Sequence, residues 1–236
     1  MVQTSRPIVQ FAPSRYDGWY DRPLGAYCLG LERDAVLAAL QPAAGQLLLE
    51  VGAGTGRFAA AAANQGARVV ATDPDVASMA WAHEHHARLT QIAWAAADGQ
   101  CLPFAEGQFD GAFTVTALCF APDHGAIVRE LRRVVRPGGR VVLGELNALA
   151  PWQLWRRVKA LAPHSPYRQA HFHTVAGLRR LVREAGLSDV RHEVLLHWLP
   201  LAQRPLLSLA PLAERLGRRF LPGLGAFVVV SAVRPA

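Results

Sequence analysis

Three glycines at alternate positions follow an apolar run and open an alanine-rich segment that is predicted to be a helix. The run is Leu47–Val51, and it carries one carboxylate just before the turn. Glycine lets the backbone turn tightly and lets a ligand approach where a Cβ would block it, and the amides at a helix start favour a negative group. We therefore predict a ligand site formed by Glu50, Gly52, Ala53, Gly54 and Gly56.

Two features of this turn argue against a dinucleotide as the ligand. The dinucleotide pattern G-x-G-x-x-G would place its third glycine at Arg57. Glu50 would also repel a pyrophosphate, because both groups are negatively charged, whereas it suits a ligand with an ammonium group. S-adenosylmethionine has an ammonium group, together with a carboxylate that the amides at the helix start could receive. Hydride transfer with a nicotinamide is the least favoured hypothesis.

Two further acidic residues follow the next two predicted strands. Asp73 ends the second strand, and a carboxylate at that point can accept hydrogen bonds from both ribose hydroxyls. Asp75 is the better candidate to cap the helix that follows. Asp98 and Gly99 follow the third strand, where they could meet an adenine amino group and its ring, although an Asp-Gly pair is also an ordinary turn.

These residues need a scaffold that brings the ends of several strands together. From Gln46 onward, short apolar runs alternate with helical patterns, which is typical of a parallel sheet built from βαβ units. We predict an α/β fold: a Rossmann-like, seven-stranded, mostly parallel sheet flanked by helices, with an antiparallel C-terminal hairpin edge. The strands are predicted over 46–51, 68–72, 91–95, 111–116, 140–146, 190–196 and 226–233, and the helices over 24–40, 57–65, 76–89, 124–135 and 174–186.

The order of these motifs resembles the class I S-adenosylmethionine-dependent methyltransferases, and most of all their small-molecule branch (methyltransferase type 11-like). The resemblance is strongest over 47–146 and rests on the glycine turn with Glu50, Asp73, Asp98, Leu102-Pro103-Phe104, Phe109-Asp110 and Arg136-Pro137-Gly138-Gly139. Asp110 is expected to cap or bridge the sheet edge outside the site. Pro137-Gly138-Gly139 is expected to be a structural turn.

The resemblance implies roles for the individual residues. The glycine turn with Glu50 would surround the methionine end of S-adenosylmethionine, Asp73 would bind the ribose, and Asp98 with Gly99 would address the adenine. Met79 would pack on the adenine ring, and packing in the core is an equal alternative for it. Pro74 and Thr116 are also among the predicted cofactor-binding residues.

The N-terminal segment 1–40 is predicted to be a helical cap. In relatives this segment folds over the cofactor, and aromatic faces near a sulfonium could stabilise its charge. Anchoring the segment on the core is an equal alternative for the three aromatic residues that we include among the predicted cofactor-binding residues, namely Tyr16, Trp19 and Tyr20.

Methyl transfer from a sulfonium releases a neutral thioether, so it depends mostly on holding the nucleophile in place in a dry site. We see no Ser-His-Asp set, no carboxylate pair and no metal-ligand spacing, and we expect no metal. His124, near the carboxyl end of the fourth strand, is the candidate general base. His171 and His173 flank the start of the helix near Thr174 and are further candidates, with an exposed surface role as the alternative for each.

Residues 147–236 are predicted to supply substrate-covering segments and the C-terminal strands of the same domain as the core, 41–146. Long insertions such as 147–173 and 199–221 are usually lids or binding loops. Their aromatic content predicts a hydrophobic or aromatic acceptor, and covering the sheet is an equal alternative. Segment 199–221 could also contact a membrane surface. The aromatic residues are Trp152, Trp155, Tyr167, Phe172 and Trp198.

The bulk composition argues against several other classes of protein. A chain with 51% hydrophobic and 18% charged residues is neither disordered nor collagen-like. No apolar run reaches the ~18 to 20 residues that span a bilayer, no secretory signal is seen near the start, and three cysteines are too few for a disulfide framework. We expect a cytoplasmic protein that is a monomer or a homodimer.

The net charge of +7 raises the chance of an acidic partner. The arginines spread over several predicted helices, as on solvated faces, so we expect a small-molecule acceptor and no nucleic acid. Two alternatives stay open, a methyltransferase that acts on RNA or protein and a cofactor-binding module without turnover.

Overall fold

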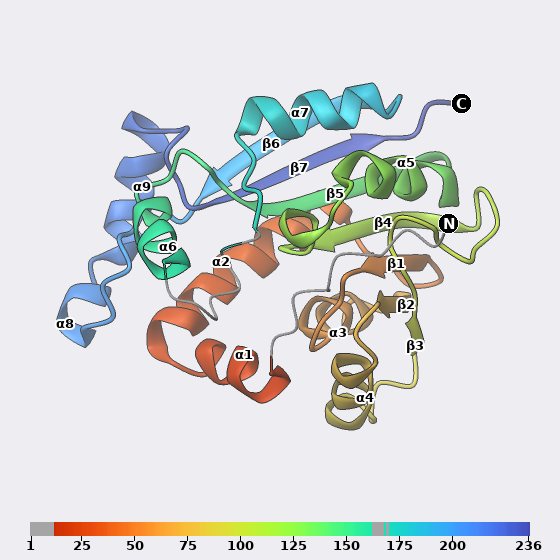
Figure 1. Ribbon diagram of the computed structural model, residues 1–236, viewed down its shortest axis with the longest axis horizontal. Coiled ribbons are helices and arrows are strands. Elements are labelled where there is room, and N and C mark those ends of the chain that lie inside the picture. The colour runs from red at the N-terminus through yellow and green to blue at the C-terminus, as the bar shows by residue number, and fades with distance from the viewer. Residues whose placement is uncertain (1–11, 162–167, 169) are drawn as a thin grey trace.

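A computed structural model describes residues 12–161, 168 and 170–236, and within them a seven-stranded sheet lies at the centre (Figure 1). The strand order is β3-β2-β1-β4-β5-β7-β6. β7 runs antiparallel to both β5 and β6, whereas the other neighbours are parallel. The strands are β1 (Leu47–Val51), β2 (Arg68–Asp73), β3 (Ile92–Ala96), β4 (Phe109–Val115), β5 (Val135–Leu146), β6 (Ser188–Leu195) and β7 (Phe227–Val233).

Helices cover both faces of the sheet, as Figure 1 shows. One face is covered by α2 (Pro23–Leu40), α3 (Arg57–Ala63) and α4 (Val76–His85), and the other by α5 (His124–Val134) and α7 (Val175–Glu184). Each face has its own cluster of buried apolar side chains. Strands that are buried on both faces are apolar along their whole length, which explains why β1 reads Leu-Leu-Leu-Glu-Val.

The remaining helices lie beyond the two layers. α1 (Pro13–Tyr20) contacts α2 and α4, and a short 3₁₀ turn, η1 (Leu118–Phe120), follows β4. α6 (Trp152–Ala160), α8 (Arg204–Leu207) and α9 (Ala210–Phe220) gather at one end of the molecule in Figure 1. No helix in the described part of the chain is both long and apolar enough to cross a membrane.

The predicted fold class is confirmed, and so is the existence of every predicted strand and helix. Two differences are informative. Helix α1 was not predicted as an element of its own. β5 begins at Val135 instead of Arg140, because the expected Pro-Gly-Gly turn lies inside this strand as an irregular stretch. Phe109 pairs with Val135 and Gly111 with Arg140, so the extra residues loop out between these pairs.

Asp110 bridges the sheet edge, as expected from the sequence. Its carboxylate accepts hydrogen bonds from the Leu47 N–H at 2.8 Å and from the Arg136 Nε at 2.8 Å. These contacts join the start of β1 to the looped stretch of β5. Asp110 therefore acts at the end of the sheet opposite to the glycine turn.

Candidate active site

The glycine turn follows β1 where the strand order reverses, between β1 and its neighbour β4. In open α/β sheets, ligands bind outside the carboxyl ends of the strands at this switch point. The Gly52 and Ala53 N–H groups both donate to the Thr72 carbonyl, at 2.7 and 2.9 Å. The turn is therefore fixed to the end of β2, which carries Asp73.

The three glycines of the turn all have positive φ, and they differ in what surrounds them. A Cβ on Gly52 would lie 2.2 Å from the Ala117 Cβ, and one on Gly56 would lie 2.4 Å from the Trp94 ring. Among the described residues, a Cβ on Gly54 would meet nothing within 4 Å. The outer glycines thus allow close packing, while no described residue packs against the middle one, which leaves room for a ligand.

Asp73 holds the middle of the turn in place. Its carboxylate accepts the Gly54 N–H at 2.9 Å and the Asp75 N–H at 2.8 Å. An ionised carboxylate has about four acceptor positions, so the same group can still receive ribose hydroxyls. Burial raises the pKa of Asp73. Asp75 caps α4 through the Ala77 N–H, as predicted, and Pro74 between the two acids is exposed.

Glu50, in β1 just before the glycine turn, is buried, with 1% of its surface exposed, and lacks a full set of partners among the described residues. Its Oε2 has no hydrogen-bond partner among the described residues. Burial and the nearby Asp73 raise the pKa of Glu50 well above its ordinary value, although a backbone hydrogen bond from Ala59 opposes the shift. A buried carboxylate with an unused oxygen calls for a cationic partner, and the ammonium group of S-adenosylmethionine fits that requirement.

Three other predicted cofactor residues lie on the neighbouring loops or beneath them. Asp98 is exposed and accepts the Gln100 N–H at 2.9 Å. Gly99 is buried, and a Cβ on it would lie 2.6 Å from the Val51 side chain, so it permits close packing. Met79, on α4, is buried in a core cluster, as the core-packing alternative expects.

Thr116, at the end of β4, has a φ of 51°. A non-glycine residue in this left-handed region carries strain, and such residues cluster at functional sites. Its N–H donates to the Gly144 carbonyl at 2.7 Å, which ties the strained residue to β5. Thr116 directly follows β4 and precedes Ala117, whose side chain a Cβ on Gly52 would meet, so it lies near the glycine turn.

Helix α1 is attached to the glycine turn by a carboxylate that the sequence analysis missed. Asp17 accepts hydrogen bonds from the Thr55 Oγ1 at 2.8 Å and from the Arg57 Nε at 2.6 Å. The Arg57 guanidinium also pairs with Asp21 at 3.2 Å. The one available signal was Arg57 itself, a charged residue where a dinucleotide site has glycine.

This attachment places the predicted aromatic residues of α1 near the turn. Tyr20 is buried, and its hydroxyl lies 3.1 Å from that of Tyr16. The Trp19 and Tyr20 rings meet edge to face with centroids 4.7 Å apart, and the Arg57 guanidinium lies over the Tyr20 ring. These contacts support the anchoring alternative for Tyr20, while Tyr16 and Trp19 are only partly buried.

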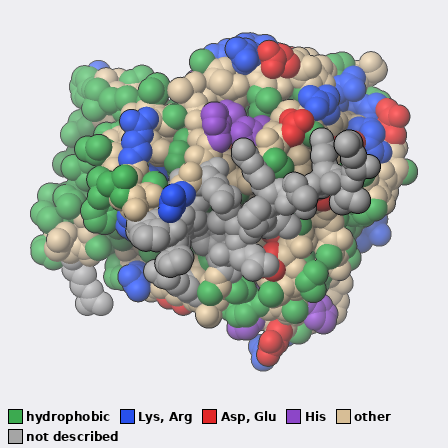
Figure 2. All heavy atoms as spheres, in the orientation of Figure 1, with side chains coloured by type: hydrophobic (Ala, Val, Ile, Leu, Met, Phe, Trp, Pro, Cys, Tyr) green, Lys and Arg blue, Asp and Glu red, His purple; other side chains and the backbone are tan. Residues whose placement is uncertain are grey.

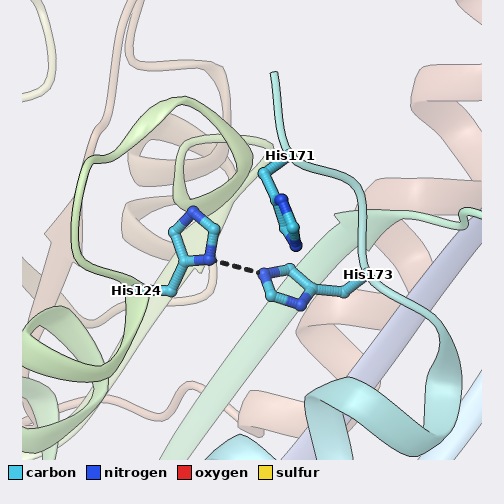
Figure 3. Close-up of side chains that lie close together, drawn as sticks. All are labelled: His124, His171 and His173. Atoms are coloured by element: carbon cyan, nitrogen blue, oxygen red, sulfur yellow. Dashed lines mark hydrogen bonds between the residues drawn. The ribbon is translucent and has the colours of Figure 1, made fainter. Parts of the chain in front are cut away.

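The three candidate bases, which the sequence analysis treated singly, form one cluster (Figure 3). His173 Nε2 and His124 Nδ1 are 2.9 Å apart and share a hydrogen bond. Burial, followed by neighbouring histidines, lowers the pKa of His124 and lowers that of His173 to about 4. Both imidazoles are therefore neutral near pH 7. The cluster was missed because His124 is far from His171 and His173 in the sequence and meets them only through the fold.

A cavity of ≈ 270 Å³ adjoins this cluster. It lies between α6 and the segment before α7, and His171 belongs to both the cavity wall and the histidine cluster. Of the aromatic residues expected to line an acceptor pocket, Phe172 lines this cavity, whereas Trp152 is buried in the core. Tyr167 lies outside the described residues.

Comparison with known proteins agrees with this geometry. Residues 49–143 match a family described as a methyltransferase domain. The structure resembles a SAM-dependent methyltransferase of Thermotoga maritima, with a TM-score of 0.72, 20% identity and coverage of 94% of this chain and 95% of that one. The core therefore carries the methyltransferase-domain match, in a fold that it shares with SAM-dependent methyltransferases. A phosphoethanolamine N-methyltransferase of Haemonchus contortus, crystallised in complex with S-adenosyl-L-methionine, has a similar fold (TM-score 0.64, 16% identity, 98% and 62% coverage).

Relatives of this methyltransferase domain are also found by sequence. An uncharacterized protein of Mycobacterium tuberculosis is 35% identical over 188 residues, which is 78% of this chain and 61% of the relative. A demethylmenaquinone methyltransferase of Beutenbergia cavernae is 35% identical over 136 residues, or 56% of this chain and 55% of the relative. The chain thus spans less than two thirds of the length of these curated relatives.

Proposed function

We propose that this protein transfers the methyl group of S-adenosylmethionine to a small, hydrophobic or aromatic molecule. The observation that carries the proposal is the buried Glu50, whose Oε2 has no partner among the described residues, in the strand that leads into the glycine turn. A site for a nucleotide phosphate would not bury a carboxylate at this point. A ligand with an ammonium group would pair with it.

Each side of the site has a distinct task in this proposal. S-adenosylmethionine supplies a methyl group on a sulfonium, which departs as a neutral thioether. Glu50 would hold the ammonium group, Asp73 the ribose and Asp98 the adenine. α1 would close the cofactor side through Asp17 and help to exclude water.

The acceptor would enter from the side of the histidine cluster and the adjoining cavity. Phe172 gives this cavity an aromatic wall, and Arg156 lies at its edge. The relative from Beutenbergia cavernae is named for a small-molecule substrate, which favours a small molecule here over RNA or protein. Filter binding over a salt series separates these alternatives, because RNA binding would give a steep dependence on salt.

The cofactor assignment predicts a specific loss of binding in Asp73→Ala. We expect the Kd for S-adenosylhomocysteine, measured by calorimetry, to rise at least ~10-fold, equivalent to about 1.4 kcal/mol, because the ribose and the Gly54 N–H both lose an acceptor. Asp75→Ala is the matched control: it removes the cap of α4 and costs ~1 kcal/mol of stability without altering the Kd. Equal affinity of Asp73→Ala and the parent would remove the ribose role.

A second proposal concerns the surface around segment 199–221, which we propose contacts a membrane. Among the described residues, every exposed large apolar side chain except Val76 lies between Leu149 and Leu224. Figure 2 shows hydrophobic side chains gathered over the end of the molecule that carries α6, α8 and α9. Isolated exposed apolar residues are ordinary, whereas a concentration of them marks an interaction surface.

A further inference from the structure

Three histidine side chains from two distant parts of the chain converge at the acceptor side of the site (Figure 3). His124 begins α5, whereas His171 and His173 precede α7. The three ring centroids are 4.6 to 5.2 Å apart. One ligand nitrogen from each ring lies within 4.8 Å of the other two. No role proposed above for the methyltransferase core requires three imidazoles at one point.

The backbone fixes each of these positions independently of the ring contacts. The His171 N–H donates to the Cys119 carbonyl at 2.7 Å, just after β4. His173 pairs with Asn147 in an isolated bridge just after β5, and its carbonyl accepts the Ala148 N–H at 2.9 Å. The carboxyl ends of β4 and β5 therefore hold both histidines opposite the start of α5.

We propose that His124, His171 and His173 bind one divalent transition-metal ion of the Zn²⁺ class. Neutral imidazole nitrogen is a preferred ligand of Zn²⁺ and of similar ions. With Zn–N bonds of about 2.0 to 2.1 Å, two ligand nitrogens of a tetrahedral site lie roughly 3.3 Å apart. His124 Nδ1 and His173 Nε2, at 2.9 Å, are already close to that separation. On binding, the ring that now donates this hydrogen bond would shift its proton to its other nitrogen, so that each neutral imidazole offers a lone pair to the ion.

The third ligand, His171, can complete the site without disturbing the core. Its side chain is exposed, and it belongs to a segment without regular secondary structure. His124 Nε2 is buried and has no hydrogen-bond partner among the described residues. The ring of His124 is thus held by packing and by its contact with His173. His171 would therefore be the ligand that moves a short distance toward the other two when the ion binds.

Three protein ligands leave a coordination position open, which is the arrangement of catalytic metal sites. Because His171 also lines the ≈ 270 Å³ cavity, a molecule bound there could occupy that position. Resting on the proposed function, we assign this position to an acceptor with an acidic hydroxyl, such as a phenol or an enol. The hydroxyl proton would pass to water. The oxygen would form the new O–C bond with its electron pair, while the C–S bond breaks and sulfur keeps its pair.

The test uses the full chain, freed of metal with a chelator and titrated with Zn²⁺ alone by calorimetry. We expect one ion per chain, and at least a ~10-fold weaker affinity in His171→Ala. His83→Ala is the matched control, since His83 is an exposed histidine on α4 and should leave the affinity unchanged. Co²⁺ gives a second readout: its visible absorption should change on binding to the parent and not in His173→Ala.

The outcomes separate this inference from the proposed function. Titration with S-adenosylhomocysteine in the absence of metal reports the cofactor site, and it also shows whether each variant is folded. S-adenosylhomocysteine binding without stoichiometric Zn²⁺ binding would overturn the metal site alone. Zn²⁺ binding that is equally tight in the parent, His171→Ala and His173→Ala would overturn it as well. Zn²⁺ binding without S-adenosylhomocysteine binding would leave the metal site standing and reject the proposed function.

Discussion

Two buried glutamates, Glu50 and Glu145, lie near the carboxyl ends of β1 and β5. We assign them different roles. Glu50 has an oxygen without a partner, which suits it to a cationic ligand. Glu145, fully buried in β5, also has an Oε2 without a partner among the described residues, and its Oε1 accepts the Leu118 N–H at 2.9 Å. That bond fixes η1, whose Cys119 carbonyl accepts the His171 N–H. Glu145 is therefore a positioning residue for the acceptor side.

Glu145 also predicts how the stability of the protein depends on pH. Burial raises the pKa of Glu145 from 4.5 to about 8. Between these values the folded state keeps a proton that the unfolded chain has released, so the free energy of unfolding falls as the pH rises from about 4.5 to about 8. Glu145→Gln keeps an oxygen acceptor for Leu118, and we expect a flatter dependence of the urea midpoint on pH.

The control for this prediction is Glu84→Gln, a change of an exposed glutamate on α4 that should retain the slope of the parent. The urea midpoint of Glu145→Gln will still depend on pH to some extent, because burial raises the pKa of Glu32 to about 8 as well. A variant at Glu145 whose midpoint follows the parent at every pH would show that this carboxyl is not held protonated in the folded state.

At the level of elements, α1 is the part of the cofactor side with the fewest attachments to the sheet. It contacts α2 and α4, and Asp17 ties it to the glycine turn. The Asp17 side chain is only 15% exposed, whereas that of Asp21, on the same arginine, is 72% exposed. The two ion pairs of Arg57 should therefore differ in strength, since exposed pairs contribute only about 0 to 1 kcal/mol.

This difference predicts unequal effects on cofactor binding. Hydrogen bonds to charged groups contribute roughly 1.5 to 3 kcal/mol, so Asp17→Ala should raise the Kd for S-adenosylhomocysteine ~10-fold or more if α1 closes the site. Asp21→Ala should raise it less than ~5-fold. Both are measured by calorimetry, with thermal melting as the check on folding. Equal effects of the two variants would mean that α1 does not act through Asp17.

Local patterns predicted the elements well because each one depends on its own residues. The glycine turn is set by three residues with positive φ and by one apolar strand, all contiguous. α1 escaped prediction because its contacts to Thr55 and Arg57 come from another part of the chain. The start of β5 was misplaced because Pro137 normally ends an element, and here the strand accommodates it in an irregular stretch.

At the scale of the whole molecule, the histidine cluster illustrates what a sequence leaves hidden. His124 and His173 meet because β4 and β5 are neighbours and both end at the same edge of the sheet. The spacing of His124 and His173 along the chain does not predict this contact. The same holds for the apolar surface on segment 199–221, because only the packing of α9 decides which of its faces is covered.

That packing carries the last prediction, on membrane contact. α9 buries Ala210, Glu214 and Gly217 against the protein. Leu212, Leu216 and Phe220 lie on a different face and are exposed by 51%, 47% and 67%. Exposed leucines beside arginines are typical of helices that lie on an anionic membrane surface. We therefore expect the protein to co-sediment with vesicles that contain phosphatidylglycerol, less with phosphatidylcholine alone, and less as salt is raised.

Leu212→Ser combined with Leu216→Ser should reduce this binding at least ~10-fold, because the membrane would no longer bury two leucine side chains, a loss of more than about 1.4 kcal/mol. Val76→Ser is the matched control, since Val76 is exposed on α4, away from this surface, and its change should leave the binding unaltered. Sedimentation without vesicles shows whether a second copy of the chain covers the leucines instead. A dimer that dissociates in the double variant, with no vesicle binding by the parent, would assign the surface to self-association and end the membrane proposal.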